Sequence, residues 1–170
     1  MAQTAATKVP EIAAATETYQ KAVAAIRATR TQRVARFRKD YIDRLELLRK
    51  EITAAGDLDG VMAVKAELDR LAKHEDPTVA QKAEMTGKLR GFRDAYERER
   101  EPINQAEETE KDQALTKYLA ELEAVQQQMT KSNRLEKALA IKALREKILE
   151  KGEVPAAPVS SNAPSIPIGG

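Results

Sequence analysis

The feature that most constrains this chain is a long stretch, from Pro10 to Ala55, that contains no internal proline or glycine. Large apolar residues recur through it at alternating steps of four and three. They are Tyr19, Val23, Ile26, Val34, Phe37, Tyr41, Leu45, Leu48 and Ile52, with Arg30 at the position where the series lacks an apolar side chain. This spacing places the apolar side chains on one face of an α-helix. We therefore predict one long amphipathic helix.

The residues that follow predict a return of the chain and then a second long helix. Gly56 suits the left-handed backbone conformation that ends many helices, and Asp57 is a good N-cap for a short helix after it. Asp76 followed by Pro77 predicts the start of a third helix, which we expect to continue to about Thr130.

Two further signals concern the second half of the chain. Pro102 lies within the third helix and has no backbone donor, which predicts a kink near residues 98–102 or, as the alternative, a break. A second turn is predicted at Ser132–Asn133. Glu136 is placed to complete a capping box for a last short helix, which we expect to end near Lys151.

The sequence also aligns with itself without a gap when it is shifted by 77 residues. The aligned pairs include Tyr19 with Tyr96, Tyr41 with Tyr118, Leu45 with Leu122, Gly56 with Asn133, Leu58 with Leu135 and Lys65 with Lys142. Such self-similarity indicates an internal duplication. We predict an all-α fold of two long-short antiparallel helical hairpins, related by this 77-residue repeat, that form an elongated rod or bundle.

These signals divide the chain into four parts. We expect a disordered N-terminal stub over residues 1–9, a first hairpin repeat over 10–75 and a second over 76–151. Residues 152–170 are rich in proline, alanine and serine, and this composition predicts a linker or tail.

Composition excludes several classes of site. The chain has no cysteine and one histidine, so disulfide frameworks, thiolate nucleophiles, zinc fingers, clustered-histidine metal sites and Ser-His-Asp triads are ruled out. We expect no catalytic, cofactor-binding or metal-binding residues, and hence no enzyme. No apolar run approaches the length of a membrane-spanning helix, so we expect a soluble chain without a transmembrane segment.

Charge is distributed unevenly between the two predicted long helices. Between residues 18 and 39 the sequence has seven basic residues and no acidic one, whereas the aligned window 95–116 has seven acidic residues against three basic ones. The candidate interaction residues are Arg27, Arg30, Arg33 and Arg36 in the basic window and Glu101, Glu107, Glu108 and Asp112 in the acidic window, with Gly56 and Asn133 as the turn residues.

We consider three roles for these windows. They could pair with each other, within the chain or between chains; they could be solvated surface; or the basic window 21–39 could bind an anionic membrane surface or another polyanion. Arginine at every third residue spirals around a helix instead of forming one stripe, and the net charge is only +2, so nucleic acid is an unlikely partner. Arg30 and Glu107 occupy equivalent positions and form either a register-setting contact or a polar gap open to water.

The first repeat resembles a known family. The segments Tyr41-Ile-Asp-Arg-Leu45, Ala55-Gly-Asp-Leu-Asp-Gly60 and Ala63-Val-Lys-Ala-Glu67 are similar to those of an uncharacterised helical module in secreted or envelope proteins of planctomycetes and verrucomicrobia. In the second copy, Asn133-Arg-Leu-Glu136 replaces the Gly-Asp-Leu-Asp segment. The resemblance implies an extracytoplasmic helical spacer or interaction unit with no assigned catalytic residue.

Together these observations predict a structural or protein-interaction module, a spacer or oligomerisation unit of a larger extracytoplasmic protein. The expected partner is protein, including a second copy of the chain. The alternative is a module that binds an anionic membrane surface or a polyanion through the basic window.

Overall fold

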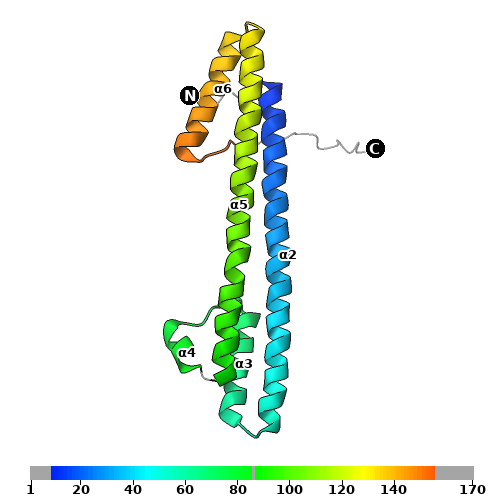
Figure 1. Cartoon of the computed structure of the whole chain (residues 1–170), viewed down its shortest axis with the longest axis vertical. Coiled ribbons are helices and arrows are strands. Elements are labelled where there is room, and N and C mark those ends of the chain that lie inside the picture. The colour runs from blue at the N-terminus through cyan, green and yellow to red at the C-terminus, as the bar shows by residue number, and fades with distance from the viewer. Residues whose placement is uncertain (1–8, 86, 156–170) are drawn as a thin grey trace, which may run out of the picture. The chain divides into compact units, whose positions relative to one another are not determined.

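The computed structural model describes residues 9–85 and 87–155, and these residues form an all-helical structure (Figure 1). The described helices are α2 (Pro10–Ala54), α3 (Leu58–Ala72), α4 (Val79–Glu84), α5 (Gly87–Lys131) and α6 (Leu135–Lys151). The predicted all-α class is confirmed. The predicted stub 1–9 and tail 152–170 lie outside the described residues, apart from Val9 and residues 152–155.

Local sequence signals account for the ends of several helices. The side chain of Asp57 caps α3 by accepting a hydrogen bond of 2.9 Å from the backbone N–H of Gly60. The residues that follow α2, α5 and α6 include one with positive φ in each case: Gly56 at 75°, Asn133 at 57° and Gly152 at 66°. Glycine and asparagine adopt this conformation most readily.

The start of the second long helix differs from the prediction. Thr78 begins the short helix α4 through a capping box with Gln81, whose side chain accepts from the Thr78 N–H at 2.9 Å. This reciprocal pair satisfies two backbone donors, whereas Asp76 has its carboxylate bound to Arg93. The helix then stops at Met85, and α5 begins at Gly87. Once started, α5 continues through Pro102 without a break.

The start of α6 also differs from the prediction in one detail. The N-cap is Arg134, which makes no side-chain capping hydrogen bond, so Asn133 and Glu136 form no capping box. Asn133 instead takes up the left-handed turn conformation. A residue with positive φ lies outside the helix and cannot act as the N-cap with its usual extended backbone.

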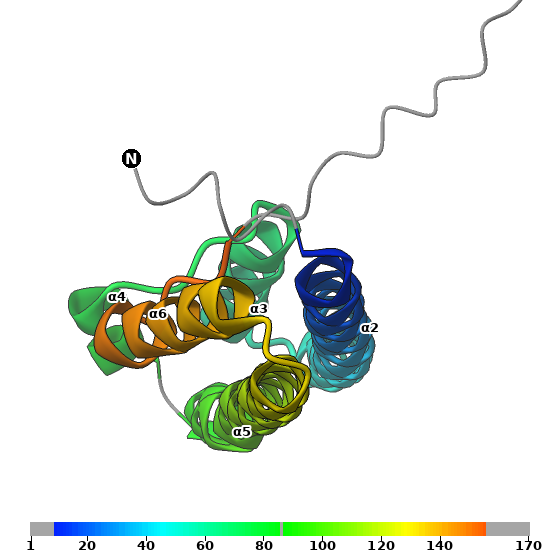
Figure 2. The same ribbon diagram turned by 90° about the horizontal axis from the view of Figure 1, so that it is seen from above.

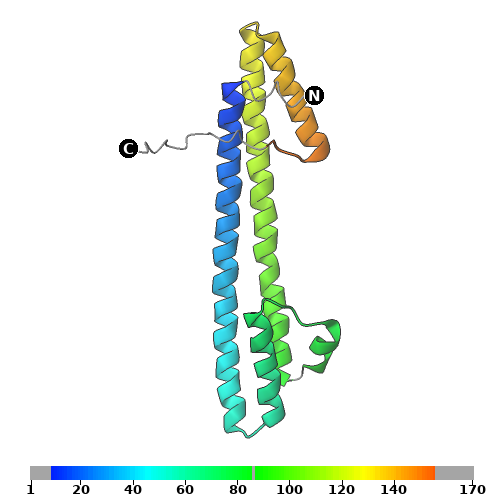
Figure 3. The ribbon, with the colours of Figure 1, turned by 180° about the vertical axis from the view of Figure 1, so that it is seen from behind.

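The chain divides into two compact units, unit 1 with residues 1–25 and 111–170 and unit 2 with residues 26–110. In unit 2, α3 lies beside the C-terminal part of α2 and the N-terminal part of α5 (Figure 3). The core contains Tyr41, Leu45, Leu48, Val64, Leu71, Met85, Leu89 and Tyr96. The ring of Tyr96 stacks against Phe37 at 5.0 Å and Tyr41 at 4.3 Å between centroids.

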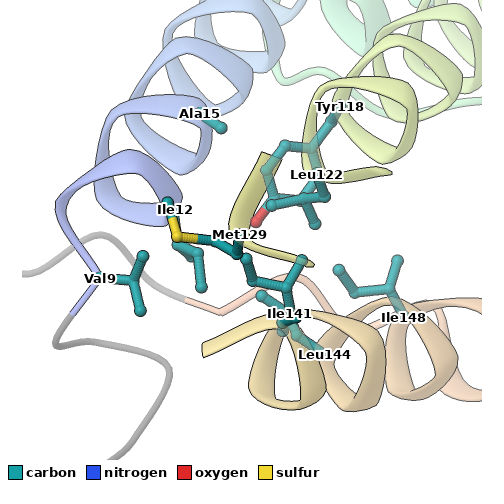
Figure 4. Packing of buried hydrophobic residues seen from close by; sticks show 10 residues of the cluster. Val9, Ile12, Ala15, Tyr118, Leu122, Met129, Ile141, Leu144 and Ile148 are labelled. Atoms are coloured by element: carbon teal, nitrogen blue, oxygen red, sulfur yellow. The ribbon is translucent and has the colours of Figure 1, made fainter. Parts of the chain in front are cut away.

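Unit 1 has its own core, built by the N-terminal part of α2, the C-terminal part of α5 and α6. Seen from above, these three helices lie at the corners of a triangle (Figure 2). The buried residues are Val9, Ile12, Ala15, Tyr118, Leu122, Met129, Ala138, Ile141, Leu144 and Ile148 (Figure 4). Tyr19 stacks on Tyr118 with 5.1 Å between ring centroids. Each unit therefore combines helices from both predicted repeats.

The turn between α2 and α3 leads to a first prediction. Gly56 has a φ of 75° and open space where a Cβ would lie, so Gly56→Val introduces backbone strain without a clash. We expect the free energy of unfolding to fall by about 1 kcal/mol or more. Asn133→Gly, at the other positive-φ turn, is the control and should be neutral or mildly stabilising. Thermal unfolding measures both, and an unchanged midpoint in Gly56→Val would contradict the strained turn.

Candidate interaction site

The centres of the two charged windows meet within unit 2. Arg30 Nε lies 2.8 Å from a carboxylate oxygen of Glu107, and Arg30 Nη2 donates a hydrogen bond of 3.2 Å to the side chain of Asn104. Arg33 Nη1 lies 3.3 Å from a carboxylate oxygen of Glu110. Both ion pairs join α2 to α5. Of the predicted candidates, the structure thus brings Arg30 and Glu107 together.

The other candidates lie elsewhere. Arg27 and Arg36 are exposed on α2. Glu101 is exposed and accepts a hydrogen bond from Gln105 at 3.4 Å. Glu108 is exposed on α5, and Asp112 belongs to unit 1. The two contacts between the windows given above therefore lie at the centres of the windows.

A buried ionic network in unit 2 was missed by the sequence analysis. The side chains of Glu67 on α3 and Arg93 on α5 are 0% and 1% exposed. Arg93 Nη1 donates to Glu67 Oε1 at 3.0 Å, and the hydroxyl of Tyr41 donates to the same oxygen at 3.1 Å. The other oxygen, Oε2, accepts from Arg70 Nε and Nη2 at 3.0 and 2.9 Å. The Glu67 carboxylate is therefore fully satisfied by hydrogen bonds.

The guanidinium of Arg93 is satisfied in the same way. Its Nε donates to Glu97 at 2.9 Å and its Nη2 to Asp76 at 2.6 Å, so every nitrogen of the group contacts a carboxylate. The outer carboxylates have further partners, because Arg100 donates to Asp76 at 3.1 Å and Lys82 contacts Glu97. A buried charge is tolerated only with such partners.

Helix geometry places both charged residues in the core. Glu67 lies between Val64 and Leu71 on the buried face of α3, at steps of three and four residues. Arg93 lies between Leu89 and Tyr96 on α5 at steps of four and three. The sequence did contain a signal for this pair. Within about 30 residues, one acidic and one basic residue each take the place of an apolar residue in the apolar stripe of a helix. It is weak by itself, because single charged residues often lie at the edge of such stripes.

The network changes the pKa of several members. The hydrogen bond from Arg93 lowers the pKa of Asp76 despite partial burial. Burial alone would raise the pKa of Glu97, but hydrogen bonds from Lys82 and Arg93 outweigh it and lower the pKa. Burial and the neighbouring Glu67 charge raise the pKa of Tyr41 well above its usual range. The folded state thus favours ionised carboxylates and a neutral tyrosine.

The corresponding place in unit 1 is almost apolar. Thr16, only 3% exposed, makes a 2.7 Å hydrogen bond between its hydroxyl and that of Tyr118. Leu144 of α6 lies in the same core (Figure 4). Burial raises the pKa of Tyr118, and the hydrogen bond with Thr16 partly offsets this effect. Thr16, Tyr118 and Leu144 each lie 77 residues from Arg93, Tyr41 and Glu67, respectively.

Other kinds of site were sought in the described ranges. No group of three or more histidine, aspartate or glutamate side chains in residues 9–85 and 87–155 is arranged to hold a metal ion. Every helix in these ranges is too short or too polar to cross a bilayer. No family model, curated protein or solved structure matches the chain.

The Arg30–Glu107 pair leads to a second prediction. Arg30→Glu places two carboxylates together, and we expect a loss of roughly 0.5–1 kcal/mol in the free energy of unfolding because the pair is partly exposed. The exchanged variant Arg30→Glu/Glu107→Arg should recover most of the loss. Arg27→Glu, at an exposed position, is the control and should have little effect. Melting at low and high salt tests this, and no recovery in the exchanged variant would contradict the pairing.

The lowered carboxylate pKa values lead to a third prediction. Asp76 and Glu97 hold their protons less tightly in the folded than in the unfolded chain. Their stabilising contribution is therefore complete above the unfolded pKa of about 4 and is lost as the pH falls through the folded pKa. We expect the midpoint temperature of thermal unfolding to decrease when the pH is lowered below about 4.

The matched variants are Asp76→Asn, which should reduce this pH dependence, and Glu99→Gln, at an exposed position of α5, which should not. The measurement is the melting midpoint by circular dichroism between pH 2 and pH 7. Equal pH profiles for wild type and Asp76→Asn would contradict the role of Asp76.

Proposed function

We propose that this chain is a structural protein-interaction module, a helical spacer or oligomerisation unit within a larger extracytoplasmic protein. The observation that carries the proposal is a pair of outward helix faces, one on α3 and one on α6, that carry exposed apolar side chains. Leu58 and Met62 are 71% and 54% exposed, and Leu135 and Leu139 are 54% and 65% exposed. Each pair spans one helical turn, so its two side chains share a face.

The two faces have the same chemistry. We define the outer faces as Leu58, Asp59, Met62, Lys65, Ala66 and Asp69 on α3, and Leu135, Glu136, Leu139, Lys142, Ala143 and Glu146 on α6, all of them exposed. Each member of the first set lies 77 residues before its counterpart in the second, and every counterpart has the same chemical character. Exposed positions usually tolerate substitution at little cost to stability. Matching exposed faces therefore support a binding role.

The inner sides of the same helices differ more. Three partly or fully buried positions differ in size, in charge or in both between the two helices. They are Gly60, Glu67 and Leu68 on α3 and their counterparts Lys137, Leu144 and Arg145 on α6. Buried positions are normally the more restricted ones, because their substitution alters packing. The contrast between matching outer faces and differing inner sides supports a partner that binds the outer faces.

The proposal includes the duplication of two helical hairpins. It is supported by the two stacked tyrosine pairs, Tyr19 with Tyr118 and Tyr41 with Tyr96, because Tyr19 lies 77 residues before Tyr96 and Tyr41 lies 77 residues before Tyr118. It is also supported by the positive φ of both Gly56 and Asn133. The extracytoplasmic location rests on the resemblance of the first repeat to the module of secreted or envelope proteins.

The alternative function, binding to an anionic membrane surface or a polyanion, is less well supported. Arg27 and Arg36 are exposed and suit it. However, Arg30 and Arg33 are engaged by carboxylates of α5, and Lys39 lies 2.6 Å from Asp43. Cations that already have a carboxylate partner gain less from an added anion.

The outer faces lead to a fourth prediction. Met62→Glu/Leu139→Glu should weaken self-association about tenfold or more, since it places a charge on each face, and should leave the melting midpoint nearly unchanged because both positions are exposed. Val79→Glu is the control, because Val79 on α4 is 89% exposed but lies outside the faces. Light scattering over a concentration series measures the mass. A wild type that stays monomeric up to about 1 mM would contradict an oligomerisation unit.

A further inference from the structure

Each unit is completed by a helical segment that docks onto a pair of helices. In unit 2 the described residues of the segment Met85–Tyr96, which are all but Thr86, pack on α2 and α3, and in unit 1 the segment Val9–Tyr19 packs on α5 and α6. Leu89 lies 77 residues after Ile12, and both are buried. The chain therefore contains two similar docking segments and two similar receiving pairs. Because Val9–Tyr19 leads into α2 and Met85–Tyr96 leads into α5, each segment could reach the other receiving pair only in a second copy of the chain.

The residues that distinguish the two docked arrangements are charged in one unit and uncharged in the other. The α2–α3 pair presents Glu67, where α5–α6 has Leu144. The segment Met85–Tyr96 presents Arg93, where Val9–Tyr19 has Thr16. The tyrosine beside them is common to both units, as Tyr41 and Tyr118. The central difference is thus one buried ion pair, with its further charged partners, against one uncharged pair.

Exchanged docking would separate the two buried charges, leaving Glu67 with only Arg70 and Tyr41 as partners, while Arg93 would keep Glu97. If Val9–Tyr19 docked onto α2–α3, Glu67 would lose its 3.0 Å contact with Arg93 and face a threonine. If Met85–Tyr96 docked onto α5–α6, the guanidinium of Arg93 would lie against Leu144 in place of Glu67. Removing one member of a buried ion pair is strongly destabilising, because the other charge stays buried. Replacing both members by uncharged residues of similar volume is not. Both exchanged arrangements are therefore disfavoured, even though their apolar contacts would be similar.

We propose that Glu67 and Arg93 act as a specificity pair that lets Met85–Tyr96 dock only onto α2–α3 and Val9–Tyr19 only onto α5–α6. The partner that this pair excludes is a second copy of this chain, whose free segment could otherwise occupy the wrong pair of helices and produce swapped oligomers. The inference extends beyond the proposed function, because it holds whatever binds the outer faces.

The location of the differences between the units supports this inference. The inner positions 67 and 144 and the docking positions 93 and 16 differ in charge, whereas the outer faces match. A pair kept only for stability would not need to be charged, since apolar packing at the same place serves unit 1. A pair that makes docking selective must have different residues in the two units. Unit 2 has Glu67 and Arg93, where unit 1 has Leu144 and Thr16.

The test makes the two units alike in two opposite ways. Glu67→Leu/Arg93→Thr gives unit 2 the residues of unit 1, and Thr16→Arg/Leu144→Glu gives unit 1 the residues of unit 2. Both are made in full-length chains that also carry Met62→Glu/Leu139→Glu, so that association through the outer faces does not contribute. The chains are refolded from denaturant over a concentration series and their masses measured by light scattering after size-exclusion chromatography.

We expect the parent chain to refold to one species whose mass does not depend on concentration. Glu67→Leu/Arg93→Thr should keep its helical content and yield a fraction of higher-mass species increased roughly tenfold or more, rising with concentration and slow to revert on dilution. Refolding of this variant to the single parental species would overturn the proposal. Failure of this variant to fold would also overturn it, because the pair would then be required for folding itself.

The second variant gives an independent check. If Thr16→Arg/Leu144→Glu folds, it should also increase the higher-mass fraction. Both units would then carry the same ion pair, so the pair could no longer direct each segment to its own pair of helices. A single species at all concentrations would overturn the proposal. If the outer faces do not mediate association, the wild type and the Met62→Glu/Leu139→Glu parent should have the same mass at every concentration. That result concerns the proposed function and not the specificity pair.

Discussion

An amphipathic helix is stable in water only when another element covers its apolar stripe, and the two long helices here are much longer than the elements that can cover them. α2 and α5 have 45 residues each, whereas α3 has 15 and α6 has 17. The two ends of each long helix are therefore buried in different cores. Ile12 and Leu45 of α2 belong to separate clusters, as do Leu89 and Leu122 of α5. The division into two units follows from this distribution.

Charged residues serve two distinct purposes in unit 2. Arg30 and Glu107 lie where the apolar stripe of α2 is interrupted, and their partly exposed pair joins two helices at small gain in stability. Glu67 and Arg93 are completely buried, and each hydrogen-bonding atom has a partner from another element or from the next helical turn. The first pair depends on salt and solvent, while the second depends on the packing of three helices.

Competition between local signals explains where helix boundaries differ from those expected. Asp76-Pro77 and Thr78 are both suitable helix starts, and Thr78 is used because Gln81 completes its capping box while Asp76 binds Arg93 and Arg100. The outcome at Asp76 could not be read locally, since the two arginines lie 17 and 24 residues further along the chain. At Asn133, the same residue type suits both a cap and a left-handed turn, and the turn prevails.

The sequence by itself determined the all-helical class, the extent of α2 and the turn at Gly56, because apolar spacing and the backbone preferences of glycine and proline act over a few residues. It also indicated which windows carry opposite charge. Only the tertiary structure decided that Arg30 contacts Glu107 while Arg27 stays exposed, and that Glu67 and Arg93 are buried. A charged residue in an apolar stripe is either at its edge or buried with a partner. The partner, here 26 residues away, is known only once the helices are packed.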